Sequence, residues 1–281
     1  MAFPQSDKSQ HADGDYALFR NYLEKACGIM LGDNKNYLID SRLRKIIKEN
    51  DFQSLAGLVT EIDRPGNSRF RQQVIDAMTT NETLWFRDNH PFLYLQNELF
   101  PKLASKPGDI SVWCAACSTG QEPYSISICA EENAKKDLSF ARKQIKILAT
   151  DISSGVLEQA KSGVYEALAL RRGMSDQRLK QHFKSENNSS WEIKQEIKRR
   201  IDFRAINLKD NFVTIGSFDI VFCRNVLIYF STELQKQILN NIHRVLKPNG
   251  YLFLGGSETP KGLTDLFETH FYRPGVVYIK K

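Results

Sequence analysis

Two short stretches of the sequence carry residues that could bind a nucleotide-like ligand. The first, residues 110–124, is apolar up to Ala116, small from Cys117 to Gly120, and continues into Pro123. This order predicts a buried strand, a tight turn and the first turn of a helix. Backbone N–H groups in such a turn can approach a ligand closely, and the helix N-terminus favours negative charge.

The second stretch, residues 144–150, predicts a strand that ends in Asp151. A carboxylate at the tip of the second strand of an α/β unit can accept hydrogen bonds from both ribose hydroxyls. An alternative is that Asp151 caps a helix beginning near Ser153, and the usual Gly-x-Gly-x-x-Gly is reduced here to Gly120. Taken together, the two tips favour a site that holds an adenosine between them.

The bulk composition is that of a globular protein with one large core and one small domain. The chain has 281 residues, 41% of them apolar, and a net charge of +6. It shows no signal-peptide pattern and no apolar run of about 18 residues, so we expect a soluble, cytoplasmic protein without membrane insertion. Cys114-x-x-Cys117 resembles half a zinc site, but no partner pair stands at ligand spacing, and we therefore expect no metal.

The positive charge gathers in two segments. Residues 171–204 hold ten Lys and Arg against five Asp and Glu. The predicted helix 36–49 carries a second basic group: Arg42, Arg44, Lys45 and Lys48. Such groups indicate an acidic partner, either nucleic acid or an acidic protein surface, although a solvated helix face explains each of them equally well.

Apolar spacing divides the chain into a helical part and an α/β part. Helices are predicted over 16–27 and 36–49, and two shorter ones after Ser54 and Ser68, which stand where N-caps belong. We expect a helical N-terminal domain over residues 1–78 and a linker over 79–90 that lines a cofactor cleft.

The remainder, residues 91–281, alternates strands with helices, which is typical of a parallel sheet. The expected elements are helices 91–103, 122–134, 153–161 and 232–246, and strands 110–116, 144–150, 201–206, 218–223 and 251–254. Residues 165–200 interrupt this rhythm and predict an inserted antiparallel β-subdomain whose last strand covers 191–198. Phe271 and residues 276–279 predict a closing antiparallel pair.

Four motifs together resemble the CheR-type chemotaxis receptor methyltransferases. They are Met-Thr-Thr-Asn-Glu-Thr-Leu-Trp-Phe-Arg at 78–87, Ala-Cys-Ser-Thr-Gly-Gln-Glu-Pro-Tyr-Ser at 116–125, Ala-Thr-Asp-Ile at 149–152 and Phe-Cys-Arg-Asn-Val-Leu-Ile-Tyr-Phe at 222–230. The resemblance implies a Rossmann-like class I methyltransferase domain that uses S-adenosylmethionine and releases S-adenosylhomocysteine. It also implies methyl transfer to glutamate side chains on the cytoplasmic methylation helices of chemoreceptors.

The same resemblance implies roles for individual residues. Asn81, Thr83 and Arg87 would contact the methionine end of the cofactor, Glu122 the ligand beside the first turn, Asp151 the ribose, and Asn207, Leu208, Arg224 and Asn225 the adenine side and the cleft floor. Tyr229 and Arg87 would be catalytic, and the basic group of helix 36–49 would bind the receptor. Simpler roles stay open: Arg87 could form a surface ion pair, Asn207 a turn, Glu122 a first-turn helix charge and Tyr229 a core contact.

The expected reaction requires little acid–base machinery. A glutamate side chain with a pKa of about 4.3 is already ionised at neutral pH, so ester formation needs alignment with the sulfonium methyl and no general base. Two other functions compete. One is a nucleic-acid methyltransferase, although the sequence has no Asn/Asp-Pro-Pro-Tyr-like element and no aromatic platform for a flipped base. The other is a receptor-binding module that senses S-adenosylmethionine without turnover.

The inserted subdomain bears on a further partner. Some members of the family hold a receptor C-terminal pentapeptide there as an added strand, and they resemble one another in a longer loop that contains glycine. This chain has Lys-Ser-Glu-Asn-Asn-Ser-Ser at 184–190, which is shorter and has no glycine. We therefore expect an enzyme that works independently of the pentapeptide.

Overall fold

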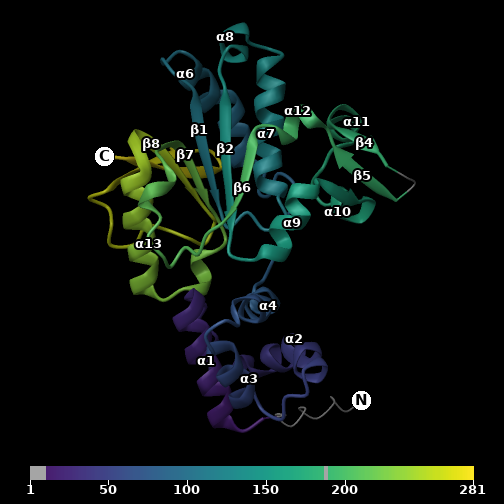
Figure 1. Cartoon of the computed structure of the whole chain (residues 1–281). Coiled ribbons are helices and arrows are strands. Elements are labelled where there is room, and N and C mark those ends of the chain that lie inside the picture. The colour runs from purple at the N-terminus through teal and green to yellow at the C-terminus, as the bar shows by residue number, and fades with distance from the viewer. Residues whose placement is uncertain (1–10, 187–188) are drawn as a thin grey trace, which may run out of the picture. The chain divides into compact units, whose positions relative to one another are not determined.

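The computed structural model describes residues 11–186 and 189–281. These residues form two compact units, and each is described by itself (Figure 1). The first comprises the chain up to Thr80 together with Tyr229–Ser231, and the second comprises Asn81–Ile228 and Thr232–Lys281.

The first unit is helical. Its elements are α1 (Asp13–Cys27), η1 (Asp33–Lys35), α2 (Asn36–Glu49), α3 (Leu55–Asp63) and α4 (Ser68–Met78). Each helix turns apolar residues inward, with Phe19, Leu43 and Leu58 fully buried. The prediction that Ser54 caps a helix is confirmed, because its side chain accepts the Gly57 N–H of α3. The same prediction for Ser68 is wrong, since this residue is already the first residue of α4.

The second unit is built on a seven-stranded sheet in the order β6-β2-β1-β7-β8-β10-β9. The strands are β1 (Ile110–Ala115), β2 (Ile145–Asp151), β6 (Ile201–Ala205), β7 (Phe218–Cys223), β8 (Leu246–Leu254), β9 (Phe267–Tyr272) and β10 (Gly275–Lys280). From β6 to β8 every pairing is parallel, and Cys114 in the middle lies opposite Ala149 on one side and Phe222 on the other. The carboxyl ends of β1 and β2 therefore meet at one edge, as both nucleotide-binding stretches require.

Helices cover this sheet. They are α5 (His90–Tyr94), the π-helix η2 (Leu95–Leu99), α6 (Phe100–Ala104), α7 (Gln121–Ala134), α8 (Leu138–Ala141), α9 (Ser154–Ser162) and α13 (Thr232–Val245), with short 3₁₀ turns η3 (Val213–Ile215) and η4 (Leu227–Tyr229). Helices α7 and α9 pack against β2 and β6, and α13 packs against β8. The β9–β10 hairpin confirms the predicted closing antiparallel pair.

An inserted subdomain lies between α9 and β6. It consists of β3 (Val164–Glu166), α10 (Ala167–Arg171), α11 (Asp176–His182), β4 (Phe183–Ser185), β5 (Ser190–Ile193) and α12 (Gln195–Lys198), and its antiparallel sheet has the order β3-β5-β4. The predicted strand over 191–198 is wrong beyond Ile193, because the chain turns into α12. This turn buries Ile197, whose carbonyl accepts the Ser127 hydroxyl of α7 at 2.8 Å.

A mostly parallel sheet, a helical unit and a small antiparallel insert confirm the predicted fold class. All five cysteines are free and buried. No helix within residues 11–186 and 189–281 is both long and apolar enough to cross a lipid bilayer.

Candidate functional site

The turn after β1 passes so close to its neighbours at one point that only a small residue fits there. Ala116, Ser118 and Gly120 have φ angles of 59°, 51° and 93°, in the left-handed region. A Cβ on Gly120 would lie 3.0 Å from the Ala160 Cβ and 3.1 Å from the Tyr165 hydroxyl. The single glycine therefore stands where the turn passes closest to its neighbours.

Asp151 joins the tips of β1 and β2. Its side chain is 6% exposed and accepts the Ser118 N–H at 2.8 Å and the Ser153 N–H at 3.0 Å. The cap of α9 itself belongs to Ser153, whose hydroxyl accepts the Val156 N–H. The carboxylate thus fastens the turn after β1 to the end of β2.

The segment after the helical unit, Asn81–Asp88, lies beside this turn; we call it the cofactor segment. The Ser118 hydroxyl donates to the Asn81 carbonyl at 2.9 Å. Thr83 and Arg87 are both half-buried, and the positive charge of Arg87 opposes part of the rise that burial causes in the pKa of Glu122. The structure therefore brings these residues, predicted from three motifs, into one neighbourhood.

Arg224 connects two carboxylates at the end of β7. Its guanidinium, 2% exposed, donates to Glu122 at 2.9 Å, to Asp88 at 2.6 Å and to the Arg87 carbonyl at 3.1 Å. Burial raises the pKa of Glu122, and the positive charge of Arg224 opposes part of that rise. Glu122 is therefore more than the first-turn helix charge considered from the sequence, because its side chain is an anchor for Arg224.

Glu258 is a site residue that the sequence reasoning missed. Its buried carboxylate accepts three backbone N–H groups, from Asn225 and Gly255 at 2.7 Å and from Leu227 at 2.8 Å. These bonds hold Asn225 at a φ of 58°, and a Cβ on Gly255 would lie 2.9 Å from the Asn225 backbone nitrogen. The signal was the pair Gly255-Gly256 followed by an acid, directly after the strand that ends at Leu254.

Asn207 and Leu208 follow β6, the strand next to β2. The Ile206 N–H donates to the Asp151 carbonyl at 3.0 Å, which places both residues close to the β2 tip. The Asn207 side chain accepts the Lys209 N–H at 3.1 Å, so the turn that was considered as its alternative role exists. Leu208 is buried.

Other predicted residues belong to the helical unit. Tyr229 groups with it, is half-buried, and accepts the Met30 N–H at its carbonyl. Arg42 donates to the Met78 carbonyl at 2.6 Å and to the Thr80 hydroxyl at 2.8 Å. These two hydrogen bonds from Arg42 therefore hold the end of α4 in place.

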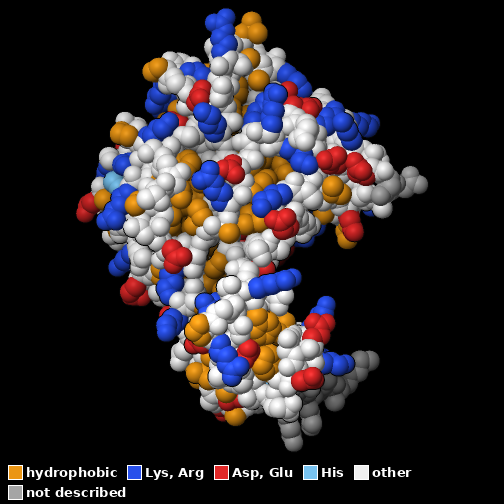
Figure 2. Space-filling model, in the orientation of Figure 1, with side chains coloured by type: hydrophobic (Ala, Val, Ile, Leu, Met, Phe, Trp, Pro, Cys, Tyr) orange, Lys and Arg blue, Asp and Glu red, His pale blue; other side chains and the backbone are white. Residues whose placement is uncertain are grey.

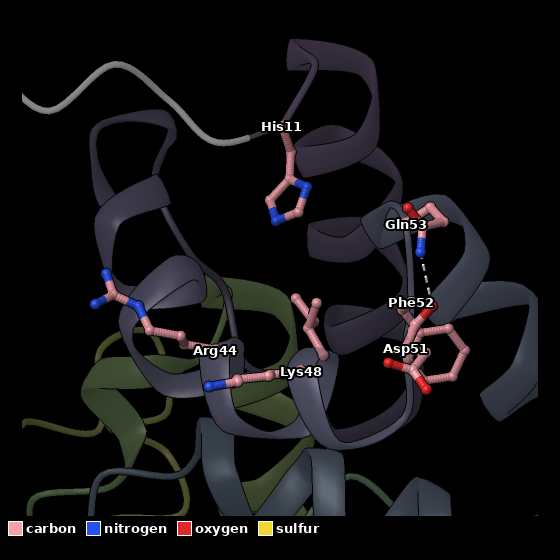
Figure 3. Close-up of a pocket in the computed structure, with 7 residues that line it drawn as sticks. His11, Arg44, Lys48, Asp51, Phe52 and Gln53 are labelled. Carbon is pink, nitrogen blue, oxygen red and sulfur yellow. Dashed lines mark hydrogen bonds between the residues drawn. The ribbon is translucent and has the colours of Figure 1, made fainter.

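The rest of the basic group on α2 points outward. Arg44, Lys45 and Lys48 are exposed. Figure 3 shows Arg44 and Lys48 extending from α2 to the same side, at the rim of a shallow cavity of about 290 Å³. His11 and Phe52 also line this cavity. An open, cationic rim of this kind suits an acidic protein surface better than an enclosed small molecule.

Metal ligands are not grouped in the described part of the chain. Within residues 11–186 and 189–281, no three His, Cys, Asp or Glu side chains come together as a metal site would require. Burial raises the pKa values of the Cys114 and Cys117 thiols well above the ordinary value for cysteine. Both sulfurs are thus packing groups at the base of the turn.

The donor set suits an adenosine cofactor with an amino acid tail. A buried carboxylate at the β2 tip can accept a ribose diol, and the turn after β1 brings backbone amides close to it. Asn81, Thr83 and Arg87 carry side chains of the polar and cationic kinds that such a tail, with its carboxylate and ammonium, requires. The residues present therefore fit S-adenosylmethionine.

Comparison with known proteins agrees with this fit. The family model described as CheR methyltransferase, SAM binding domain, matches residues 81–276, and the model described as CheR methyltransferase, all-alpha domain, matches residues 14–79. Chemotaxis protein methyltransferase Cher2 of Pseudomonas putida is 47% identical over 269 residues, which cover 95% of this chain and 98% of that protein. Chemotaxis protein methyltransferase 1 of Pseudomonas aeruginosa is 46% identical over 272 residues, with 96% and 99% covered. The corresponding protein of Salmonella typhimurium is 32% identical and covers 91% of this chain. The chain belongs to the CheR methyltransferase family.

Proposed function

We propose that this chain transfers the methyl group of S-adenosylmethionine to glutamate side chains on the cytoplasmic helices of chemoreceptors. The observation that carries the proposal is the match to chemotaxis protein methyltransferases along 95% of the chain, from the helical unit to the last strands. The joined tips of β1 and β2 support it independently, because their buried carboxylate and close backbone turn suit an adenosine cofactor.

The cofactor contacts follow from the neighbourhood around Asp151. We assign Asp151 to the ribose hydroxyls, Asn207 and Leu208 to the adenine side, and the cofactor segment to the methionine end. Arg224 and Asn225 form the floor, which Glu122 and Glu258 hold through the hydrogen bonds described above. In this assignment the floor is rigid before the cofactor arrives, and little ordering cost falls on binding.

S-adenosylmethionine supplies an electrophilic methyl group on a sulfonium, which a receptor carboxylate attacks so that the methyl–sulfur bond breaks as the ester forms. The chain's task is alignment and exclusion of water, because the nucleophile is already ionised. We assign Arg87 and Tyr229 to this task. Arg87 would orient carboxylates near the reacting methyl, and Tyr229 would contact the incoming glutamate side chain.

The receptor-docking face is assigned to α2, through Arg44, Lys45 and Lys48. All three are exposed, and the methylation region of a receptor is acidic by this proposal because it carries the substrate glutamates. Arg42 has a different assignment, since both of its donor groups serve contacts inside the helical unit.

The nucleic-acid alternative is less well supported by the charge pattern. Five of the ten basic residues in 171–204 form ion pairs: Arg172, Arg178, Lys198, Arg200 and Arg204. On the face of the larger unit that Figure 2 shows, acidic side chains are interspersed with the basic ones over the insert. Paired charges neutralise phosphates poorly, and therefore the insert does not provide a continuous electrostatic track.

We also propose that the enzyme is independent of a receptor C-terminal pentapeptide. The strands at the two edges of the inserted sheet, β3 and β4, are three residues long, which leaves few backbone groups for an added strand. The short loop that motivated this expectation includes residues 187 and 188, which lie outside the described residues. Titration with the free pentapeptide decides the matter: saturable binding at micromolar concentration would overturn independence, and normal methylation of tail-less receptors would support it.

The test of the catalytic proposal is methyl transfer from radiolabelled S-adenosylmethionine to receptor-containing membranes. We expect label on the receptor that mild base releases, as a carboxyl ester requires. Label on nucleic acid would favour the competing enzyme. Cofactor binding without transfer to any receptor would favour the sensing module.

A further inference from the structure

The backbone conformation of the cofactor segment depends on the elements that pack against it. It forms neither helix nor strand, and Phe86 and Asp88 adopt φ angles of 49° and 66°. Residues other than glycine are disfavoured in this region and persist there only when the surroundings hold them. The elements that pack on the segment therefore determine whether Asn81, Thr83 and Arg87 are correctly placed.

The inserted subdomain holds Trp85. This side chain is 1% exposed and packs edge-on against Tyr165 of β3 at 4.9 Å and Phe183 of β4 at 5.4 Å between ring centroids. The backbone N–H of Trp85 donates to the Arg172 carbonyl at 3.2 Å. Gly173, at a φ of 106°, passes so close that a Cβ there would lie 2.0 Å from the Trp85 carbonyl oxygen.

The insert also holds Phe86, through Arg178 of α11. The guanidinium carbon lies 3.9 Å from the centroid of the Phe86 ring. On its other side Arg178 makes two hydrogen bonds to Glu132 of α7, at 2.8 and 2.9 Å. Because Glu132 fixes the position and orientation of this guanidinium, Arg178 can hold the Phe86 ring in place through a cation–π contact.

We propose that Arg178 and Gly173 are positioning residues for S-adenosylmethionine, so that the insert sets the cofactor affinity by holding Trp85 and Phe86. The inference rests on the assignment of Asn81, Thr83 and Arg87 to the methionine end of the cofactor. Neither Arg178 nor Gly173 belongs to that contact set. Both act through the backbone of the cofactor segment.

A matched control is Arg200, which forms an ion pair with the same helix, α7. Arg200 pairs with Glu131, the neighbour of Glu132 on α7, at 2.6 Å and is similarly buried. Arg200 also donates to the Glu196 carbonyl, and within residues 11–186 and 189–281 neither this hydrogen bond nor its ion pair involves the cofactor segment. Arg178→Met and Arg200→Met thus each remove an ion pair to α7, and only the first removes a contact to Phe86.

The first experiment compares these two variants in the full-length protein. Calorimetry with S-adenosylhomocysteine gives the dissociation constant, and hydrogen exchange followed by mass spectrometry reports on residues 81–88. We expect Arg178→Met to weaken binding about tenfold and to speed exchange in the segment, whereas Arg200→Met stays within about twofold. Kinetically, the KM for S-adenosylmethionine rises, and kcat falls by less than kcat/KM because saturating cofactor re-orders the segment that carries Arg87. Equal effects of the two variants, or unchanged binding in folded Arg178→Met, would overturn the proposal.

The second experiment does not depend on the stability of the Arg178 variant. Gly173→Ala and Gly108→Ala both place alanine at a positive φ, but nothing lies within 4 Å of a Cβ on Gly108. We expect weaker binding only for Gly173→Ala; equal loss in both would contradict the inference. Because the readout is cofactor binding, it stands apart from receptor methylation. A wild-type protein that binds cofactor but methylates no receptor would refute the proposed function and leave this test intact.

Discussion

The two regions assigned to binding differ in the burial and hydrogen bonding of their charged side chains. Around the cofactor site, Arg224 is 2% exposed and bonded to two carboxylates and a carbonyl, and Asp151 accepts two backbone N–H groups. On α2, Arg44, Lys45 and Lys48 extend into solvent. Buried, hydrogen-bonded charges give a fixed geometry suited to a small ligand. Exposed charges steer a large partner and are screened by salt.

The largest expected effect comes from removing the carboxylate that joins the strand tips. Asp151→Ala deletes a charged acceptor for the ribose, a contact worth about 1.5–3 kcal/mol, and should weaken S-adenosylmethionine binding roughly 10- to 100-fold. Calorimetry on the folded variant measures this loss. Asp137, which is only half-buried and caps α8 by accepting the Ser139 N–H, is the control, and Asp137→Ala should bind normally. Unchanged affinity in folded Asp151→Ala would show that the site is misplaced.

A second prediction concerns the pH dependence of the free energy of unfolding, which buried carboxylates should affect and exposed ones should not. Burial alone would raise the pKa of Glu132, but the neighbouring His182 ring, with its Nε2 3.6 Å away, and the hydrogen bonds from Arg178 outweigh burial and lower the pKa well below its ordinary value. A lowered pKa adds stability above the unfolded value of about 4.3, and this stability is lost as pH falls below it. Glu132→Gln should therefore cost about 2 kcal/mol at pH 7, a difference that shrinks toward pH 3.5.

Urea denaturation of wild type and Glu132→Gln between these pH values measures the difference. Glu49, exposed on α2, is the control, and Glu49→Gln should change the free energy of unfolding little at any pH. A cost for Glu132→Gln that stays constant over the whole pH range would mean that the carboxylate does not titrate with folding.

The smallest expected effect is on the α2 face. Arg44→Glu combined with Lys48→Glu should raise the KM for receptor several-fold, since exposed charges contribute about 0.2–1 kcal/mol each, and should leave cofactor binding unchanged. Initial rates with receptor membranes measure this. Reversal of two exposed lysines elsewhere, Lys106→Glu combined with Lys136→Glu, changes the net charge equally and is the control. An unaltered receptor KM would count decisively against this face.

The sequence was most informative where a local pattern and a tertiary requirement coincide. Alternation of apolar runs located β1, β2 and β7, and the small residues before Gly120 located the turn, because each depends on nearby residues. The motifs then placed Asp151 and Arg224 at strand ends, which a parallel sheet brings together.

What the sequence could not show depends on partners far along the chain. Glu258 is an ordinary acid in sequence, and only its three backbone donors, two of them about 30 residues away, make it a site residue. Arg178 counted as one charge in a basic segment, although it contacts Phe86, 92 residues earlier. The helix α12 was missed because Ile197 at strand spacing is equally compatible with one buried helical turn.

The most direct test of the contrast between the two regions is ionic strength. Receptor KM and the dissociation constant of S-adenosylmethionine should be measured on the same wild-type preparation from about 0.05 to 0.5 M salt, over which the Debye length falls roughly threefold. We predict that receptor KM rises steeply while cofactor affinity stays nearly flat. A receptor KM independent of salt, or a cofactor affinity that falls in parallel with it, would contradict the account.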